Sequence, residues 1–204
     1  MSEQTPKPQS LSDSLRPKVA GILQPIGRGL IRLRITANAI TIAGTLLMAV
    51  VGVLLASGQF LFGGLLVIAS APLDALDGTV ARLSGVKSKF GAFLDSTSDR
   101  YADGFILLGL MLYGLNHRQD WMVILAFVAV WGSLLVSYTR ARAEGLDLEC
   151  KIGLLTRMER FIIIVVMLIF NLILPGLIVL AVLTHVTAFQ RIWYVRRVMR
   201  EMNL

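Results

Sequence analysis

Four aspartates stand at helical intervals inside a strongly apolar part of the chain, and their spacing predicts paired carboxylates. Asp74 and Asp77 are three positions apart, whereas Asp95 and Asp99 are four positions apart. Side chains at either separation lie on the same face of an α-helix, so each pair would present two carboxylates side by side. Asp103 continues the second face one turn later, either as a hydrogen-bond partner behind the pair or as a partner elsewhere in the bundle. If the two faces pack together, the chain forms one acidic site.

Such a site needs compensating charge where it lies among apolar residues. A charged side chain at the centre of a bilayer costs roughly 2.5 to 3.5 kcal/mol on insertion scales, so four would oppose insertion by on the order of 10 kcal/mol. Hard divalent cations prefer oxygen ligands, and two Mg²⁺ or Mn²⁺ ions would balance four carboxylates while leaving positions open for phosphate oxygens. We therefore predict a two-metal site with the ligands Asp74, Asp77, Asp95 and Asp99.

The elements that must position these carboxylates are membrane helices. The chain has 204 residues, of which 55% are hydrophobic, and its mean hydropathy is +0.71. These values exceed those of a soluble domain and predict an all-α integral membrane protein. The net charge of +7 does not indicate a nucleic-acid partner, because the basic residues gather at the ends of apolar segments rather than in one aromatic-rich patch.

We expect a disordered leader at residues 1–10, an interfacial amphipathic helix at 11–36, and a catalytic domain at 37–204 with six transmembrane helices. Asn38 is expected to cap the first span, and Pro175 and Gly176 are expected to turn the chain before the last. Lys and Arg are concentrated on the side that would hold both termini. The positive-inside rule therefore places the termini and the acidic site on the cytoplasmic side of the cell membrane.

The acidic stretch also carries a longer pattern, D-x2-D-G-x2-A-R-x8-G-x3-D-x3-D, which runs from Asp74 to Asp99. All eight of its fixed positions resemble the signature of the CDP-alcohol phosphotransferase family. That resemblance implies a homodimeric membrane enzyme that transfers a phosphatidyl group from CDP-diacylglycerol to an alcohol and releases CMP. It also implies that Asp99 accepts the proton of the acceptor hydroxyl in addition to holding metal.

The resemblance extends to residues that would bind the CDP-linked lipid. Residues 36–41, T-A-N-A-I-T, are similar to the family's T-P-N-x-x-T segment, although Ala37 replaces the proline. The family pattern implies that the nucleotide and the diphosphate of the donor contact this segment together with the end of the next span. The residues concerned are Asn38, Ala39, Ile40, Thr41, Gly78, Arg82 and Ser88.

Arginines at the ends of three spans predict an anion-binding region, because guanidinium groups bind phosphate in a bidentate way. The candidates for binding the acceptor are Arg140, Arg142, Arg157, Arg160 and Arg191. The segments S-Y-T-R-A-R-A-E, R-M-E-R and Q-R that contain them resemble a prokaryotic branch of the family whose acceptor is inositol 1-phosphate. This branch would form phosphatidylinositol phosphate.

Two alternatives stay open at this stage. Glycerol 3-phosphate would need much the same cationic pocket, so the product could instead be phosphatidylglycerophosphate. Buried aspartates also occur along ion or proton pathways, which would make the chain a transporter rather than an enzyme. The acids of such a pathway are expected at several depths, whereas the four aspartates here fall at one predicted level.

Overall fold

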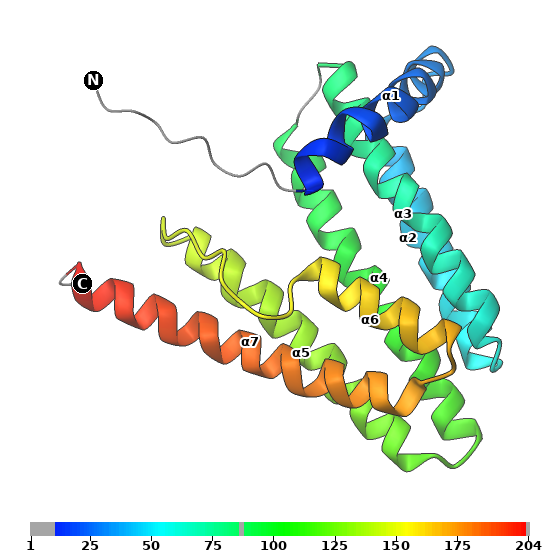
Figure 1. Cartoon of the computed structure of the whole chain (residues 1–204), viewed down its shortest axis with the longest axis vertical. Coiled ribbons are helices and arrows are strands. Elements are labelled where there is room, and N and C mark those ends of the chain that lie inside the picture. The colour runs from blue at the N-terminus through cyan, green and yellow to red at the C-terminus, as the bar shows by residue number, and fades with distance from the viewer. Residues whose placement is uncertain (1–10, 86–87, 203–204) are drawn as a thin grey trace. The chain divides into compact units, whose positions relative to one another are not determined.

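The described part of the chain, residues 11–85 and 88–202 of a computed structural model, is helical (Figure 1). Seven helices follow one another along it: α1 (Leu11–Arg32), α2 (Ala37–Ala56), α3 (Phe60–Leu83), α4 (Lys89–Asn116), α5 (Asp120–Glu144), α6 (Arg157–Ile169) and α7 (Ile173–Glu201). These described residues contain no strand, which confirms the predicted all-α class. The predicted leader at residues 1–10 lies outside them.

Four of these helices are long and apolar enough to cross a membrane, namely α2, α3, α5 and α7. α6 has 13 residues, which at 1.5 Å per residue gives about 20 Å, short of the ~30 Å apolar core of a bilayer. α4 has 28 residues, but it carries the charged residues Asp95, Asp99, Arg100 and Asp103. The chain is therefore a membrane protein with four candidate spans among its described residues. The predicted count of six would need α4 and α6 as well.

The chain turns before α7 earlier than the sequence predicted. Asn171 adopts a left-handed conformation with φ 54°, and the N–H of Leu172 donates to the carbonyl of Met167 (2.8 Å). Pro175 therefore lies inside the first turn of α7 instead of between two helices. A proline is tolerated there because its missing N–H would have had no partner within the helix.

The start of α2 also differs from the prediction. The N–H of Ala39 donates to the hydroxyl of Thr36 (3.2 Å), so Thr36 caps the helix in place of Asn38. Asn38 consequently belongs to the first turn of α2, and its side chain is not used as the cap.

The chain folds as two compact units. The first contains the described residues up to Gly44 together with Ala71–Asp95, and the second contains Thr45–Ser70 and the described residues from Ser96 onward. α2, α3 and α4 each contribute to both units. The predicted donor-binding residues belong to the first unit, and the five candidate acceptor arginines belong to the second.

An apolar core to which α2, α3, α4, α5, α6 and α7 all contribute holds the second unit together. Its fully buried side chains include Val51, Leu55, Leu107, Leu110, Met167, Leu168, Leu177 and Leu180. Large apolar side chains are also exposed on the helices of this unit, for example Val53 at 70% and Trp121 at 72%. Exposed apolar surface on this scale is typical of helices that lipid covers.

Glycines let neighbouring helices of the second unit approach closely. A Cβ built at Gly52 of α2 would lie 2.6 Å from the carbonyl oxygen of Phe105 in α4, and one at Gly109 would collide with the carbonyl of Gly52. α5 and α7 meet in the same way, because a Cβ at Gly132 would collide with the buried Thr184. Small residues at such contacts allow tight packing of membrane helices. This packing fixes the position of α4 within the unit.

Gly52→Ala is expected to destabilise the protein by about 1 to 3 kcal/mol, because the added methyl group must push α2 away from α4. Gly44→Ala in the same helix is a matched control, since nothing lies within 4 Å of a Cβ built there. Alanine favours a helix over glycine, so the control should keep or raise the unfolding temperature. Thermal unfolding in detergent measures both variants, and equal midpoints would show that the α2–α4 contact is not tight.

Candidate active site

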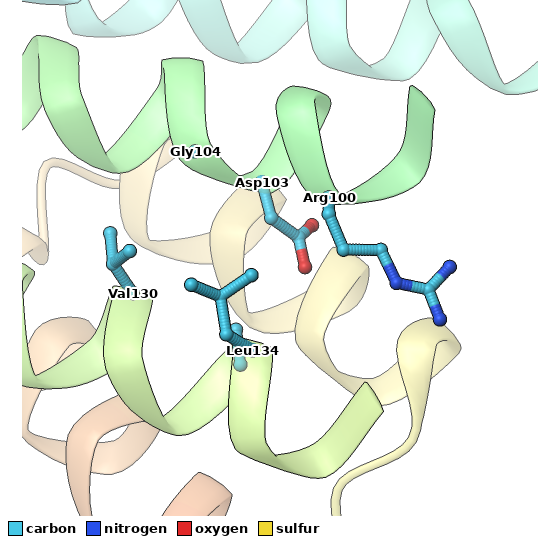
Figure 2. A pocket seen from close by; sticks show the side chains of 6 residues that line it. Arg100, Asp103, Gly104, Val130 and Leu134 are labelled. Carbon is cyan, nitrogen blue, oxygen red and sulfur yellow. The ribbon is translucent and has the colours of Figure 1, made fainter. Parts of the chain in front are cut away.

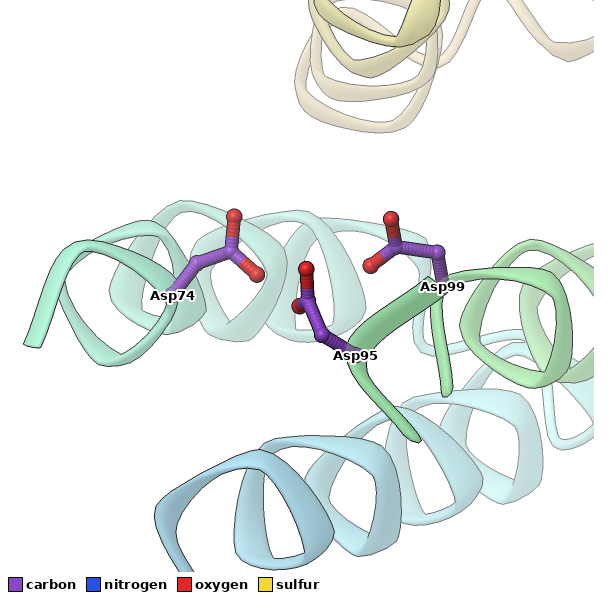
Figure 3. A group of neighbouring side chains, drawn as sticks. All are labelled: Asp74, Asp95 and Asp99. Atoms are coloured by element: carbon purple, nitrogen blue, oxygen red, sulfur yellow. The ribbon is translucent and has the colours of Figure 1, made fainter. Parts of the chain in front are cut away.

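Asp74 on α3 and Asp95 on α4 approach each other within the first unit, with carboxylate oxygens less than 4.8 Å apart. Asp99 follows one turn after Asp95 on the continuous helix α4, and one of its oxygens lies within the same distance of Asp95 (Figure 3). A divalent cation with oxygen ligands at about 2.0 to 2.6 Å bridges oxygens up to about 5 Å apart. The Asp74 and Asp95 carboxylates of the first unit therefore fit such a cation.

Asp77, the fourth predicted metal ligand, is near enough to Asp74 and Asp95 to interact with them electrostatically, and it is only 9% exposed. Its carboxylate accepts a hydrogen bond from the hydroxyl of Thr41 (2.8 Å), which also donates to the carbonyl of Ala37 (3.1 Å). The structure thus joins a predicted metal ligand to a predicted donor-binding residue, one on α3 and the other on α2. The hydrogen bond orients the carboxylate, as partners behind metal ligands commonly do.

Two further predicted donor-binding residues meet at Gly91, near the start of α4. The hydroxyl of Ser88 accepts a hydrogen bond from the N–H of Gly91 (2.8 Å) and so caps the helix. A Cβ at Gly91 would lie 3.1 Å from the Ser88 hydroxyl and 3.3 Å from the side-chain oxygen of Asn38. The glycine therefore leaves room for both polar side chains. Between Asn38 and Thr41, Ile40 is buried, whereas Ala39 is exposed.

Arg82, in the last turn of α3, folds back along its own helix. One terminal nitrogen donates to the hydroxyl of Thr79 (3.0 Å), and the other would lie 3.5 Å from a Cβ built at Gly78. Arg82 is exposed, so its guanidinium remains open to an anionic ligand. The missing side chain at Gly78 leaves the adjacent backbone accessible.

Two of the five candidate acceptor arginines form ion pairs with acids of α4 inside the second unit. Arg157 contacts Asp99 at 2.6 Å, and Arg160 contacts Asp103 at 3.0 Å. The first pair is partly open to solvent, with 46% of the Arg157 side chain exposed, whereas only 6% of the Arg160 side chain is exposed. The same charge pairing therefore occurs in two different environments.

The other three candidate arginines are arranged differently. Arg191 on α7 is 3% exposed and donates to the carbonyls of Ile152 (2.9 Å) and Val136, so its guanidinium ties α7 to α5 and to the segment before α6. Arg140 and Arg142 are exposed in the last turns of α5. All three belong to the second unit together with Arg157 and Arg160.

The start of α6 is fixed by its own cap and by α7. Thr156 and Glu159 form a reciprocal capping box, in which the N–H of Thr156 donates to the Glu159 carboxylate (2.8 Å). The N–H of Leu155 donates to the buried hydroxyl of Thr187 on α7 (3.0 Å). Arg157 is the first residue after this cap, so the cap and the contact with α7 hold its backbone in place.

Three features of the site were not predicted. The sequence did not identify the hydrogen bond from Thr41 to Asp77 or the position of Arg100, which lies 3.7 Å from Asp99. It also grouped Arg160 with the arginines that would bind the acceptor, although its side chain is buried against Asp103. The one relevant signal in the sequence was the position of Asp103 one turn after Asp99 on the same helix face, which suggested a partner for Asp103 but did not identify it as Arg160.

An all-helical membrane protein with clustered carboxylates and arginines beside them belongs to the class that can act on phosphate groups at a membrane. Residues 34–192 match the family model named CDP-alcohol phosphatidyltransferase, and the chain belongs to this family. It is therefore a phosphatidyltransferase, and the resemblance found in the sequence from Asp74 to Asp99 is confirmed.

Individual relatives cover nearly the whole chain. An archaetidylinositol phosphate synthase of Pyrococcus horikoshii is 41% identical, with 90% of this chain and 95% of the relative covered. The crystal structure of Mycobacterium tuberculosis phosphatidylinositol phosphate synthase with CDP-DAG bound is 33% identical, with a TM-score of 0.82 over 86% of this chain and 94% of that one. A structure of the same protein with manganese and citrate has a TM-score of 0.79, is 33% identical, and covers 85% and 88%.

Proposed function

We propose that this enzyme transfers a phosphatidyl group from CDP-diacylglycerol to inositol 1-phosphate, with release of CMP and formation of phosphatidylinositol phosphate. The relatives support inositol phosphate as the head group of the product. The archaetidylinositol phosphate synthase and the phosphatidylinositol phosphate synthase are named for different lipids, but both names contain inositol phosphate. The structural observation that carries the proposal is the 2.6 Å contact between Arg157 and Asp99. It brings a phosphate-binding group next to the carboxylate that would activate the acceptor hydroxyl.

Asp74, Asp77, Asp95 and Asp99 would hold two divalent cations, Mg²⁺ or Mn²⁺. The carboxylate oxygens of Asp74 and Asp95, which lie less than 4.8 Å apart, support this assignment, as does the complex of the mycobacterial synthase with manganese. When bound, the cations would supply positive charge that polarises the diphosphate and stabilises the departing CMP. The hydrogen bond from Thr41 would keep the Asp77 carboxylate in a fixed orientation.

The donor would be held by residues of the first unit. Arg82 would pair with a diphosphate oxygen, and the backbone next to Gly78 would allow the phosphate to come close. The side chains of Asn38 and Ser88, which meet at Gly91, would offer hydrogen bonds to the nucleotide end of the lipid. Ala39, Ile40 and Thr41 would complete this surface.

Asp99 would act as the general base of the transfer. It would accept the proton of the acceptor hydroxyl as that oxygen forms a bond to the lipid-bearing phosphorus. The bond between this phosphorus and the oxygen bridging to CMP breaks, and CMP departs with the bonding electrons. Arg157 would bind the phosphate of the acceptor, with Arg140, Arg142 and Arg191 contributing positive charge to the same region.

Arg157→Ala is expected to raise the KM for inositol 1-phosphate roughly ten- to a hundredfold, because it removes a charge-assisted contact of about 1.5 to 3 kcal/mol. The KM for CDP-diacylglycerol should change little, since the donor is assigned to other residues. Separate titrations of the two substrates measure both values. Arg197→Ala is a matched control, because that exposed arginine pairs with Glu201 at the end of α7. An unchanged acceptor KM in Arg157→Ala would remove Arg157 from the acceptor site.

The acceptor itself is tested by supplying purified protein with CDP-diacylglycerol and, in parallel, inositol 1-phosphate, glycerol 3-phosphate, inositol or serine. CMP release that occurs with inositol 1-phosphate, and with none of the other three acceptors, supports the proposal. Equal or faster release with glycerol 3-phosphate would make the enzyme a phosphatidylglycerophosphate synthase. Absence of CMP release with every acceptor would contradict the proposed reaction.

We also propose that α2 to α7 all cross the membrane, with α1 at its surface and both termini and the site on the cytoplasmic side of the cell membrane. α4 is about 42 Å long at 1.5 Å per residue, which exceeds the apolar core of a bilayer. α6, at about 20 Å, would cross where the bilayer thins locally around it. The distribution of Lys and Arg supports the orientation. The homodimeric state implied by the family resemblance is part of the same proposal.

A further inference from the structure

The partly buried ion pair between Asp103 and Arg160 takes no part in the reaction as derived so far. We propose that it is a positioning pair, which fixes the first turn of α6 against α4 and thereby holds Arg157 beside Asp99. The inference rests on the proposed role of Arg157 in binding the phosphate of the acceptor. It separates Arg160 from the arginines that contact the acceptor directly.

Two ion pairs connect the same two helices one turn apart. Asp99 and Asp103 are four residues apart on α4, and Arg157 and Arg160 are three residues apart on α6, so both pairs lie on facing sides of the helices. The outer pair joins Arg157 to Asp99 at 2.6 Å, and the inner pair joins Arg160 to Asp103 at 3.0 Å. Fixing the inner pair therefore sets the distance between the members of the outer pair.

The two ion pairs differ in how readily the arginine can leave its carboxylate for another partner. The Arg157 side chain is 46% exposed, so it can turn to a soluble phosphate without leaving water. The Arg160 side chain is 6% exposed, and a change of partner there would leave the Asp103 carboxylate without its buried countercharge. Arg160 is therefore suited to a permanent contact, whereas Arg157 is suited to a ligand that comes and goes.

The cavity next to Asp103 is too small for a phosphate. It has a volume of about 10 Å³ and is lined by Arg100, Asp103, Gly104, Val130, Ser133 and Leu134 (Figure 2). A space of this size holds about one water molecule. Asp103 of the inner pair thus lies beside a space that admits water and excludes the acceptor, which favours positioning over direct binding.

Asp103→Asn distinguishes the two roles by the direction of its effect. If the pair positions Arg157, the KM for inositol 1-phosphate should rise about tenfold or more, because small displacements of a binding group cost this much. The KM for CDP-diacylglycerol should stay within about twofold of the wild-type value. If Arg160 bound the acceptor itself, its release from Asp103 would leave the acceptor KM unchanged or lower it, and the inference would be overturned.

A second test combines this change with Arg157→Ala. A pair that acts through Arg157 has nothing left to position once Arg157 is gone, so adding Asp103→Asn should not raise the acceptor KM further. A full additional increase in the double variant would overturn the inference. Glu201→Gln is the matched control, because it breaks an exposed ion pair within α7 that joins no two helices.

Asp103→Asn leaves a buried charge on Arg160 and can lower the yield of folded protein. The double variant Asp103→Leu/Arg160→Met removes both charges and replaces them with apolar side chains, a change that buried pairs often tolerate. It should unfold near the wild-type temperature and still show the raised acceptor KM. A folded double variant with a normal acceptor KM would overturn the inference even if Arg157→Ala behaves as expected. If Arg157→Ala itself has no effect, the acceptor assignment fails, and this inference fails with it.

Discussion

Asp95→Asn should lower the rate of CMP release more than about a hundredfold at ordinary Mg²⁺ concentrations, because the amide removes a negative charge and a strong oxygen ligand. Asp74→Asn and Asp77→Asn are expected to have the same effect. Since the carboxylates do not form part of the apolar core, folding should survive each change. The measurement is CMP release over a range of Mg²⁺ and Mn²⁺ concentrations, in parallel with thermal unfolding.

The control for these variants is Asp120→Asn, an exposed acid in the first turn of α5. It should keep normal activity and normal dependence on the metal. A loss of activity in the site variants that high Mn²⁺ partly restores would identify weakened metal binding as the cause. Near-normal activity in any of the three at ordinary Mg²⁺ concentrations would remove that residue from the proposed metal site.

Asp99→Asn is expected to separate binding from transfer. General-base catalysis contributes about 10²- to 10⁴-fold, so the rate at saturating substrates should fall by this amount. The affinity for CDP-diacylglycerol should remain appreciable, because the other three aspartates and Arg82 are intact. The acceptor KM can also rise, since Arg157 loses the carboxylate that it contacts at 2.6 Å.

The rate at saturation and the affinity for the donor must be measured separately in this variant. Single-turnover release of CMP from bound CDP-diacylglycerol gives the transfer step, and equilibrium binding of the labelled lipid gives the affinity. A variant that binds donor weakly but turns over normally at saturation would show that another group is the base.

The site was predictable where its geometry is local. Asp95 and Asp99 lie on one helix, so their spacing alone predicts adjacent carboxylates, and within the first unit the structure brings Asp95 close to Asp74. The recurrent spacing from Asp74 to Asp99 also led to the family, which the family model confirms. In such cases the periodicity of the helix carries the information.

Features that depend on tertiary contacts could not be predicted from the sequence. Arg160 and Asp103 are 57 residues apart, and no periodicity relates two different helices. The turn before α7 was placed at Pro175 because proline usually ends a helix, but the same residue is also well suited to a first turn. The structure places the turn at Asn171, whose φ is positive, and such a backbone conformation is uncommon for a residue other than glycine. The sequence alone therefore did not show whether the chain turns at Asn171 or at Pro175.

The tight helix contacts at Gly52, Gly109 and Gly132 have a consequence for anyone who wishes to engineer this enzyme. Replacing helical glycines by alanine is a common way to stabilise a protein, since it reduces the freedom of the unfolded chain. At these three positions an added methyl group would meet backbone or buried side-chain atoms, so the strategy would fail there. Gly44 has open space around a built Cβ, and a thermostabilised form of the protein should be sought from that position.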